Sequence, residues 1–590
     1  PFWTEREDSE RQNGFDENIE KYGVDPRECW SLDYAFAIWI GLGVIGLYNA
    51  MTRKEDLKVS EIVTVGGGFI GMGIFAWILE LISGNTHEFS YSLIYIGAVG
   101  LGLVMLAKAI GGAMKSQPSQ ALVAFLLTVV IPLNMGFEGW DDHDRSNRYS
   151  ARDFAKNYLE SCAPNAIVFT NGDNDTFPLW YVQEVENFRT DVRVVNLSLL
   201  NTDWYVTQMK RKAYDSEAVP FSLTEPQYRQ GGSRDVILMA PNPRYARGAR
   251  VTDKHVELDL VMEKFIANDD RILSLQGGDR ISYSPTNKFK MTISEADKQT
   301  LLKNGAIKAE DLDKVVSEMK WTVKESQLYK NKLMILDLLA TNNWERPVYF
   351  AITVGGSHYL NLEPYFQLEG LANRVLPIRN EDSGRGVPGK INTEIMYNNF
   401  MNKFKWGNLH EEGVYLNQDN RRMLVNFRSN FSSLIDALIQ EGKMDEAKLA
   451  LDKCFEVIPD HKLPYDYFNA SMASSYAQIG EIDKAHEIVE IIKNDCVQKL
   501  DYYFSLDSRL LDASIEDLIN RELRMNLVAV SYVYRETGNA EKMTELEGIF
   551  NKYAAMMNDL NKYLRNDLDA ESYEERIEEY MSQNASNDTL

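Results

Sequence analysis

The sequence predicts a membrane α-helical protein whose four transmembrane spans precede an extracytoplasmic α/β domain and a C-terminal set of α-helical repeats. Four uncharged apolar runs lie within residues 34–137, short apolar strands alternate with helices in residues 138–425, and glycine-separated helices fill residues 426–582. Residues 1–33 are predicted to form an extracytoplasmic segment, and the polar residues 583–590 a disordered tail.

Each apolar run is long enough to cross a membrane. The runs hold 17 to 19 residues, which as helices span a hydrocarbon core roughly 30 Å thick. A soluble protein could bury such runs as core helices, but four in succession, with glycine-rich faces suited to close helix packing, favour a membrane domain. The four predicted spans are Tyr34–Met51, Ile62–Leu79, Tyr91–Ala107 and Ser119–Phe137.

Basic residues in the loops predict the orientation of these spans. The loop after the first run carries Arg53, Lys54 and Lys58, and the loop after the third carries Lys108 and Lys115, whereas the loop after the second has neither Lys nor Arg. Since positively charged loops stay in the cytoplasm, the large part of the chain that follows the fourth run is predicted to lie outside the cytoplasm.

The charge of the chain argues against one class of partner. The net charge is −24, and residues 33–137 contribute only about −1 of it, so the acidic surface belongs to the rest of the chain. Such a surface repels phosphate backbones, so nucleic acid is not a predicted partner, whereas membrane lipids are. The chain begins at Pro1 without a signal peptide, and we expect it to be a piece of a longer or processed protein.

A βαβ unit is predicted soon after the fourth run. Ala166–Thr170 and Val192–Leu197 are short apolar strands, and Pro178–Asn187 is the helix between them, which predicts two neighbouring parallel strands. A later helix and strand within residues 329–356, joined by a turn at Trp344–Pro347, should add another strand to the same sheet.

The loop NGDNDT at the end of the first strand supplies candidate ligand-binding residues, because ligands favour this edge of parallel sheets. Two carboxylates on one loop can offer hard oxygen ligands to a divalent cation such as Mg²⁺ or Ca²⁺. Helix capping by Asp175 or Thr176, with Pro178 in the first turn, explains the same residues without a ligand. The candidates are Asn171, Asp173, Asn174, Asp175 and Thr176.

A second acidic cluster follows Trp140. Its three carboxylates and one imidazole are suited to binding a metal ion or to acid/base work beside a lipid-linked substrate. A solvated linker next to the membrane is the alternative. The sequence has no HExxH, P-loop, GxSxG or dinucleotide-binding motif, so motifs alone name no reaction. The metal candidates are Asp141, Asp142, His143 and Asp144.

The C-terminal helices show an irregular repeat. The stretches LIQEGKMDEAKLAL, YAQIGEIDKAHEIV and YRETGNAEKMTELE resemble tetratricopeptide (TPR) hairpins, although a plain helical bundle is an alternative. The glycines are 38 and 58 residues apart, so one repeat is degenerate or interrupted. Each stretch has a glycine at the turn and a small or flexible residue five positions later: Gly442 and Ala447, Gly480 and Ala485, Gly538 and Met543.

The four cysteines have no CxxC spacing, so neither a zinc ribbon nor a thioredoxin-like site is predicted. In an oxidising compartment Cys454 and Cys496 could form a disulfide, and single buried thiols are an equally good interpretation.

Three stretches resemble a known family: TNGDNDTFPLWYVQEVENFRTDVRVVNLSLLNTDWYVTQMKRK, WDDHDRSNRYSARDFAKNYLESCAPNA before it, and LMILDLLATNNWERPVYFAITVG after it. They are similar to the Bacteroidota polytopic membrane proteins of the DUF2723 family, which group with the transmembrane protein O-mannosyltransferases, over about residues 140–380. The resemblance implies a GT-C-type glycosyltransferase that transfers sugar from a lipid-phosphate-linked donor to a protein hydroxyl. In such enzymes the catalytic carboxylate lies in an early extracytoplasmic loop, which we expect before Pro1, so no catalytic residue is assigned here.

The resemblance makes this chain the C-terminal portion of a polytopic membrane glycosyltransferase, with the soluble domain positioning the acceptor or a partner protein. It implies a bacterial inner (cytoplasmic) membrane, crossed several times, with a large periplasmic C-terminal domain that meets exported acceptor proteins or envelope proteins. The alternative is a non-enzymatic envelope scaffold or assembly-complex subunit with TPR-like protein-binding repeats. A third hypothesis is a sugar or cation sensor that uses the NGDNDT loop.

Overall fold

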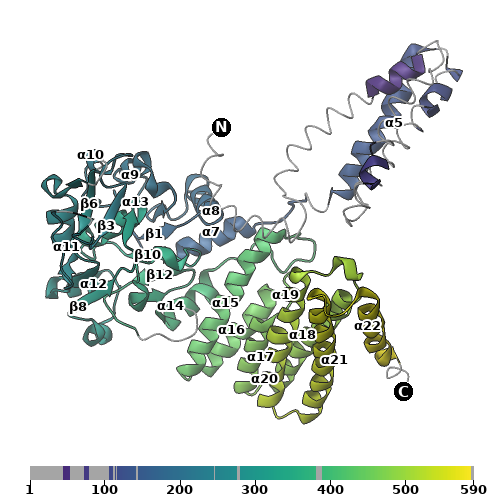
Figure 1. Ribbon diagram of the computed structural model, residues 1–590. Helices are drawn as coiled ribbons and strands as arrows, with labels where there is room; N and C mark the ends of the chain where they lie inside the picture. Colours follow the sequence, from purple (N-terminus) through teal and green to yellow (C-terminus); the bar gives the residue numbers. More distant parts are fainter. Residues whose placement is uncertain are drawn as a thin grey trace. The chain divides into compact units, whose positions relative to one another are not determined.

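The computed structural model divides the chain into two compact units, Pro1–Asp144 and Arg145–Leu590. It describes most of the second unit and part of the first (Figure 1). The described residues are 44–52, 72, 74–78, 102, 105–110, 113–114, 116–140, 144–244, 246, 248–274, 280–380 and 388–585.

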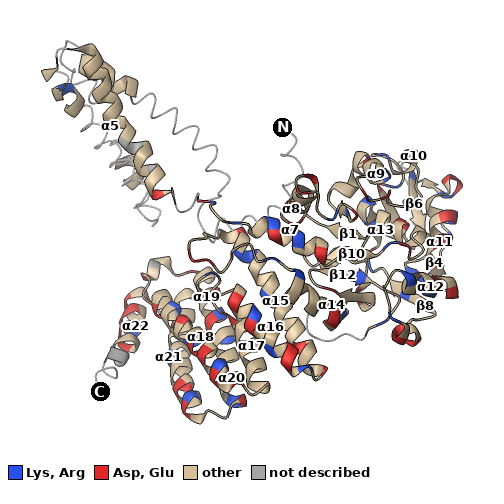
Figure 2. Cartoon of the chain, turned by 180° about the vertical axis from the view of Figure 1, so that it is seen from behind, with Lys and Arg blue, Asp and Glu red and all other residues tan. Residues whose placement is uncertain are grey.

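Helix α5, Gln117–Glu138, coincides with the fourth predicted span and is 22 residues long. Glu138 at its end is its only charged residue, so the helix is almost entirely tan in Figure 2. Its length and apolar composition suffice to cross a membrane. Several of its large apolar side chains are more than half exposed: Leu122, Phe125, Leu126, Leu133 and Phe137.

The prediction of four membrane spans is wrong as a description of this fold. Among the described residues, α5 is the one helix that is long and apolar enough to cross a membrane. Within the first three runs the structure describes only short helical pieces, such as 44–52, 74–78 and 105–110, and the rest of these runs lies outside the described residues. A span needs an unbroken helix of about 20 residues, and an apolar run in the sequence does not by itself establish one.

The second unit begins with the predicted βαβ unit. Strands β1 (Ile167–Thr170) and β2 (Arg193–Asn196) pair in parallel, and β10 (Val348–Ala351) pairs in parallel with the other side of β1, which confirms both predictions. All three strands are fully buried, as expected when both faces of a parallel sheet are covered. In the described residues, six strands form this sheet in the order β13-β11-β12-β10-β1-β2. The other three are β11 (Phe366–Leu368), β12 (Ala372–Val375) and β13 (Lys390–Ile391).

The helix between β1 and β2 starts earlier than predicted. Helix α8 runs from Asp173 to Glu184, so most of the NGDNDT loop is its first turn, and Pro178 lies in the second turn rather than the first. The preceding Gly172 has φ +98°, a backbone conformation that glycine adopts without strain. The other helices around this sheet are α7 (Ser150–Glu160), α9 (Asp203–Met209), α13 (Lys330–Thr341) and α14 (Thr393–Asn398).

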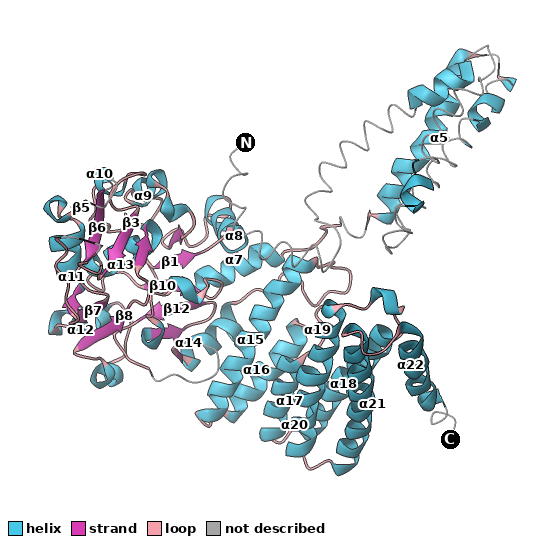
Figure 3. Ribbon diagram, viewed as in Figure 1, coloured by secondary structure: helices cyan, strands magenta, loops and turns pink. Residues whose placement is uncertain are grey.

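Residues 219–329 form two smaller sheets that the sequence did not predict (Figure 3). The order of strands is β5-β6-β3-β9 in one sheet and β4-β7-β8 in the other. Their elements are α10 (Glu225–Tyr228), β3 (Val236–Met239), β4 (Val256–Glu257), α11 (Leu258–Val261), β5 (Leu273–Ser274), β6 (Arg280–Ser284), β7 (Lys288–Thr292), α12 (Glu295–Lys303), β8 (Glu318–Thr322) and β9 (Gln327–Tyr329).

The predicted helical hairpins are present, and they stand side by side in Figure 1. At Gly442, Gly480 and Gly538, all with positive φ, the next residue donates its N–H to the carbonyl five positions earlier, a C-cap that ends each first helix. Helix α19 accounts for the longer second spacing because it lies between the second and third hairpins. The helices are α15 (Gln418–Gln440), α16 (Met444–Val457), α17 (Tyr467–Gln478), α18 (Ile482–Phe504), α19 (Ala513–Arg521), α20 (Val528–Glu536), α21 (Ala540–Leu564) and α22 (Ala570–Ala585).

One hydrophobic core joins the sheets to the helical hairpins. At the junction, Phe154 of α7 contacts Phe427 of α15 with ring centroids 5.6 Å apart, and Trp406 stacks on Phe431 of α15 at 5.5 Å. Cys454 and Cys496 are free and buried in this core. The structure therefore agrees with the interpretation as single buried thiols, not with a disulfide between them.

Candidate functional site

The carboxyl ends of β1, β2 and β10 meet at one edge of the six-stranded sheet. Strand β1 lies between two parallel neighbours, β2 reached through α8 and β10 reached through α13, and α/β proteins commonly bind ligands where connections depart to opposite sides of a central strand. Polar side chains from the strand ends meet here. Thr170 Oγ1 lies 2.7 Å from Thr176 Oγ1, which also accepts a hydrogen bond from Asn196 Nδ2 at 2.9 Å.

Asp175 completes this polar cluster from the first turn of α8. Its Oδ2 accepts hydrogen bonds from Thr353 Oγ1 at 2.6 Å and from the backbone N–H of Asn171 at 3.0 Å. Asp175 and Thr176 are 3% and 0% exposed, so both are closed off from solvent. Burial raises the pKa of Asp175, against the lowering effect of its hydrogen bonds. These two candidates therefore belong to a satisfied internal network that ties α8 to the strand ends.

The structure does not bring the two aspartates of the NGDNDT loop together. Asp173 and Asn174 are exposed on the first turn of α8, and side chains two residues apart on a helix do not face each other. Asn171 Oδ1 accepts a hydrogen bond from Ser198 Oγ at 2.9 Å. Ligand binding by the five candidate residues stays a prediction.

The second set of candidates is only partly visible. Asp141, Asp142 and His143 lie outside the described residues, and Asp144 is half-buried at the end of the first unit. Over the described parts of the chain, no group of three or more His, Cys, Asp and Glu side chains is arranged to hold a metal ion.

Replacing Asp175 by Asn should reduce the pH dependence of stability. A folded-state pKa above the unfolded value means that the folded protein binds the proton more tightly. This contribution to stability is therefore fully present below the unfolded pKa and is lost as the pH rises through the raised folded value. Thermal unfolding of Asp175→Asn across this window should show a smaller decline than that of the wild type. The exposed Asp173→Asn is the matched control, and equal slopes for both variants would contradict the assignment.

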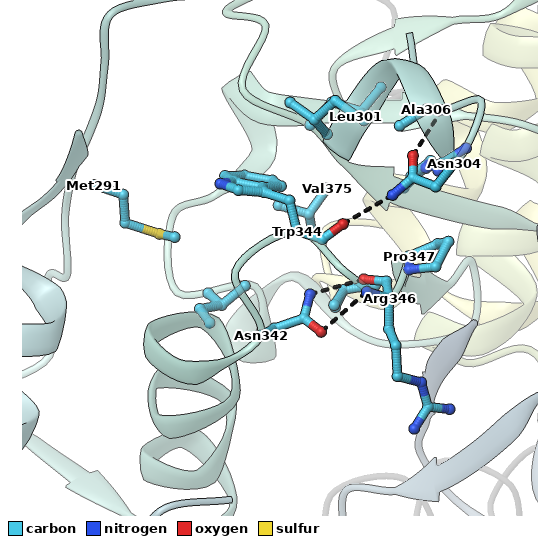
Figure 4. Close-up of a pocket in the computed structure, with 13 residues that line it drawn as sticks. Met291, Leu301, Asn304, Ala306, Asn342, Trp344, Arg346, Pro347 and Val375 are labelled. Carbon is cyan, nitrogen blue, oxygen red and sulfur yellow. Dashed lines mark hydrogen bonds between the residues drawn. The ribbon is translucent and has the colours of Figure 1, made fainter. Parts of the chain in front are cut away.

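A small cavity lies beside the turn between α13 and β10 (Figure 4). Its volume is about 20 Å³, which is room for one water molecule and no larger ligand. Asn304 Nδ2 donates to the carbonyl of Trp344 at 2.8 Å, and Asn342 Nδ2 donates to the carbonyl of Arg346 at 2.7 Å. The side chains of Asn304 and Asn342 therefore hold the predicted turn at Trp344–Pro347 in place, and the cavity beside it is too small to be a binding site.

A larger cavity, a groove of about 370 Å³, lies at the outer edge of β2. We call it the β2 groove. Helix α8, strand β2, helix α9 and the loop 213–216 contribute its walls. The aromatic residues lining it are Trp180, Trp204, Tyr205 and Tyr214, and the polar or charged ones are Gln183, Glu184, Thr190, Arg193, Gln208 and Ser216.

Reasoning from the sequence missed the β2 groove. A signal was present, because the dipeptide Trp-Tyr occurs twice, at residues 180–181 and 204–205, on the two helices that flank β2. Nothing in the sequence said that both helices would place an aromatic ring at the same edge of the sheet. That arrangement depends on which side of β1 the second strand adds, and only the fold shows it.

Part of the second unit is similar to a known protein family. Residues 151–395 match the family model described as TMEM260-associated domain 2. Over 187 residues the chain is 24% identical to the mouse (Mus musculus) protein named Protein O-mannosyl-transferase TMEM260, a stretch that covers 30% of this chain and 25% of the relative. The chain thus matches about a quarter of that relative's length. No solved structure matches the chain.

These two matches support a relationship to an O-mannosyltransferase-like family, while the narrower resemblance to the DUF2723 proteins stays a prediction. The range that matches TMEM260-associated domain 2 contains the six-stranded sheet, both smaller sheets and every residue that lines the β2 groove. The polar cluster at the strand ends also lies within it.

Proposed function

We propose that this chain is part of a glycosyltransferase of the protein O-mannosyltransferase type and that residues 145–425 position the acceptor. The match of residues 151–395 to TMEM260-associated domain 2 is the observation that carries this proposal. The geometry is compatible with a binding role, because the matched residues form an open groove. The sugar donor in this proposal is a lipid-phosphate-linked sugar, and the acceptors are hydroxyl groups of exported proteins.

The donor type suits a membrane location. A lipid-linked donor stays in the membrane, so its transferase must reach the bilayer, and helix α5 is long and apolar enough to provide an anchor. In this proposal the protein resides in a bacterial inner membrane, and the second unit faces the periplasm. Protease added to spheroplasts should therefore cleave the second unit while a cytosolic marker stays intact; protection of the second unit would contradict this location.

The decisive experiment measures O-linked mannose on exported proteins. Deleting the gene should reduce the mannose released from exported proteins by β-elimination to background, and the full-length gene supplied in trans should restore it. Complementation with an empty vector is the control. Unchanged mannosylation in the deletion strain would overturn the proposed function.

A protein-binding scaffold is the second candidate, and the stacked hairpins α15–α16, α17–α18 and α20–α21 favour it, since repeated helical hairpins commonly form binding surfaces. Under this alternative, deletion leaves mannosylation unchanged, and an envelope complex loses a subunit instead. Blue-native electrophoresis of membranes from the same two strains separates the alternatives.

A further inference from the structure

The geometry points to the β2 groove as a carbohydrate-binding site that holds a neutral, mannose-type sugar residue. This inference deepens the proposed function and rests on it for the kind of sugar: the ligand is the mannose already attached to an acceptor protein. The groove volume of about 370 Å³ lies at the small end of the range for ligand sites, which is about 300–1,000 Å³. It therefore suits one or two sugar units rather than a folded domain.

The aromatic side chains of the groove offer flat faces to a sugar ring. Trp204 and Tyr214 are 55% and 53% exposed, so both rings are available to a ligand. Trp204 is held by an edge-to-face contact with the buried Tyr205, with ring centroids 5.5 Å apart. An exposed aromatic ring fixed by a buried neighbour is preorganised to stack on the apolar face of a sugar.

Polar groups beside these rings match the hydroxyl groups of a sugar. Within the part of the chain that the structure describes, the side-chain amide of Gln208 and the indole N–H of Trp204 make no hydrogen bond, so both can bind a ligand. Glu184 accepts a hydrogen bond from the hydroxyl of Tyr214, and a carboxylate has further lone pairs to accept from sugar hydroxyls. A purely apolar ligand would cover these groups without satisfying them, at a cost in free energy.

The charges of the groove disfavour an anionic ligand such as a sugar phosphate. Arg193 is the one cation that lines it, and its guanidinium already donates to three backbone carbonyls, those of Arg211, Ser216 and Glu217, at 2.8–3.1 Å. Glu184 adds a negative charge at the rim. With no cation free to bind a phosphate, the groove favours a neutral ligand.

The backbone of the groove disfavours an extended peptide as the ligand. In a parallel pair, the backbone N–H and C=O groups of alternate residues of β2 bond to β1, and those of the residues between them point away from β1. The backbone groups of Val194 and Asn196 therefore face the groove. Tyr205 Oη occupies this edge, accepting from Asn196 N–H at 3.0 Å and donating to the carbonyl of Val194 at 3.5 Å. Gln183 Nε2 covers the carbonyl of Val192 at 2.8 Å. Strand addition is therefore blocked.

The test is isothermal titration calorimetry of the full chain with methyl α-mannoside, with a mannosylated threonine peptide and with the same peptide without mannose. The protein is kept in a detergent without a sugar headgroup, because alkyl glycosides would compete. Wild-type protein should bind both mannose-containing probes, and Trp204→Ala and Gln208→Ala should each weaken binding by about tenfold or more, as expected when a stacking ring or a ligand hydrogen bond is lost. Both positions are exposed, so the fold should tolerate these changes. Tyr532→Ala, an equally exposed aromatic on α20, is the matched control and should bind like the wild type.

Several outcomes would overturn the inference: no binding of either probe, equal binding by wild type and Trp204→Ala, or equal affinity for the mannosylated and the bare threonine peptide. The last result would mean that the groove recognises polypeptide. The proposed function is tested by a different measurement, the mannosylation of exported proteins in the deletion strain. Sugar binding with unchanged mannosylation supports the groove and rejects the transferase, and lost mannosylation without sugar binding does the reverse.

Discussion

Replacing Arg346 by Met should lower the free energy of unfolding by about 3–5 kcal/mol, because several buried acceptors lose the hydrogen bonds that the guanidinium donates to them. Arg346 is 7% exposed. Its Nε donates to the carbonyl of Asn165 at 2.9 Å, its Nη1 to that of Glu217 at 2.9 Å, and its Nη2 to Ser216 Oγ at 3.0 Å. Burial, with a smaller effect of the nearby Arg193, lowers the pKa of Arg346 to about 10, so the side chain is still charged at pH 7.

The same substitution should also weaken sugar binding, since Arg346 and Arg193 together hold the segment 211–218 against the sheet. This segment supplies Ala213, Tyr214 and Ser216 to the wall of the β2 groove. With Arg346 gone, the wall loses the hydrogen bonds that this guanidinium donates to Glu217 and Ser216. We therefore expect Arg346→Met to bind methyl α-mannoside less tightly even at temperatures at which the protein is still folded.

Denaturant unfolding followed by circular dichroism measures the loss of stability. Arg346→Lys tests the geometry, because a lysine keeps the charge but cannot reach acceptors on both sides as a guanidinium does, so we expect a loss between those of the wild type and Arg346→Met. Arg229→Met is the exposed control, since Arg229 makes one ion pair with Glu225 at 3.4 Å, and it should change stability by less than about 0.5 kcal/mol. Equal losses for Arg229→Met and Arg346→Met would contradict this account.

The parts of the fold that were predicted correctly have strong local signals. The strands β1, β2 and β10 lie in short, mostly apolar runs, and runs of this kind favour fully buried parallel strands. The helical hairpins have a glycine at each turn, and a positive φ at Gly442, Gly480 and Gly538 is what ends each helix. In both cases a few neighbouring residues determine the structure.

The parts that were not predicted depend on contacts between distant residues. Helix α8 starts at Asp173 rather than near Pro178 because Asp175 bonds to Thr353, which lies 178 residues later in the chain. That contact buries the carboxylate and separates it from Asp173, so the predicted pair of aspartates does not form. The two small sheets of residues 219–329 consist of strands of two to five residues, too short to show a periodic pattern.

The β2 groove could not be predicted from the sequence for the same reason, because distant parts of the chain come together to form it. Its residues come from four separate stretches, and each one alone is an ordinary helix, strand or loop. The polar cluster at the strand ends shows the reverse case, because the sequence marked Asp175 and Thr176 as candidates and the structure places both in a closed network. A sequence motif therefore indicates a binding residue only where the fold leaves its side chain exposed.

Replacing Phe431 by Ala should cost about 3–5 kcal/mol in the free energy of unfolding, the usual range when a fully buried aromatic ring is removed. Phe431 on α15 is 0% exposed. Its ring meets Phe400 edge-to-face at 4.6 Å and stacks on Trp406 at 5.5 Å. Neither partner can fill the space, because the segment that carries both is fixed to the sheet: Asn399 Nδ2 donates to the carbonyl of Glu369 at 2.6 Å, and Lys405 N–H to Asn157 Oδ1 at 2.8 Å.

The position of this ring predicts where the damage appears. Phe431 lies at the junction of the α/β part and the first helical hairpin, so Phe431→Ala should loosen the junction and expose the connection at residues 404–417 to limited proteolysis. Phe431→Leu keeps most of the volume and should cost less than about 1.5 kcal/mol. Leu449→Ala on α16, where the side chain is 53% exposed, should be nearly neutral. If Phe431→Ala unfolds at the same denaturant concentration as Leu449→Ala, the sheet and the hairpins do not share the continuous core seen here.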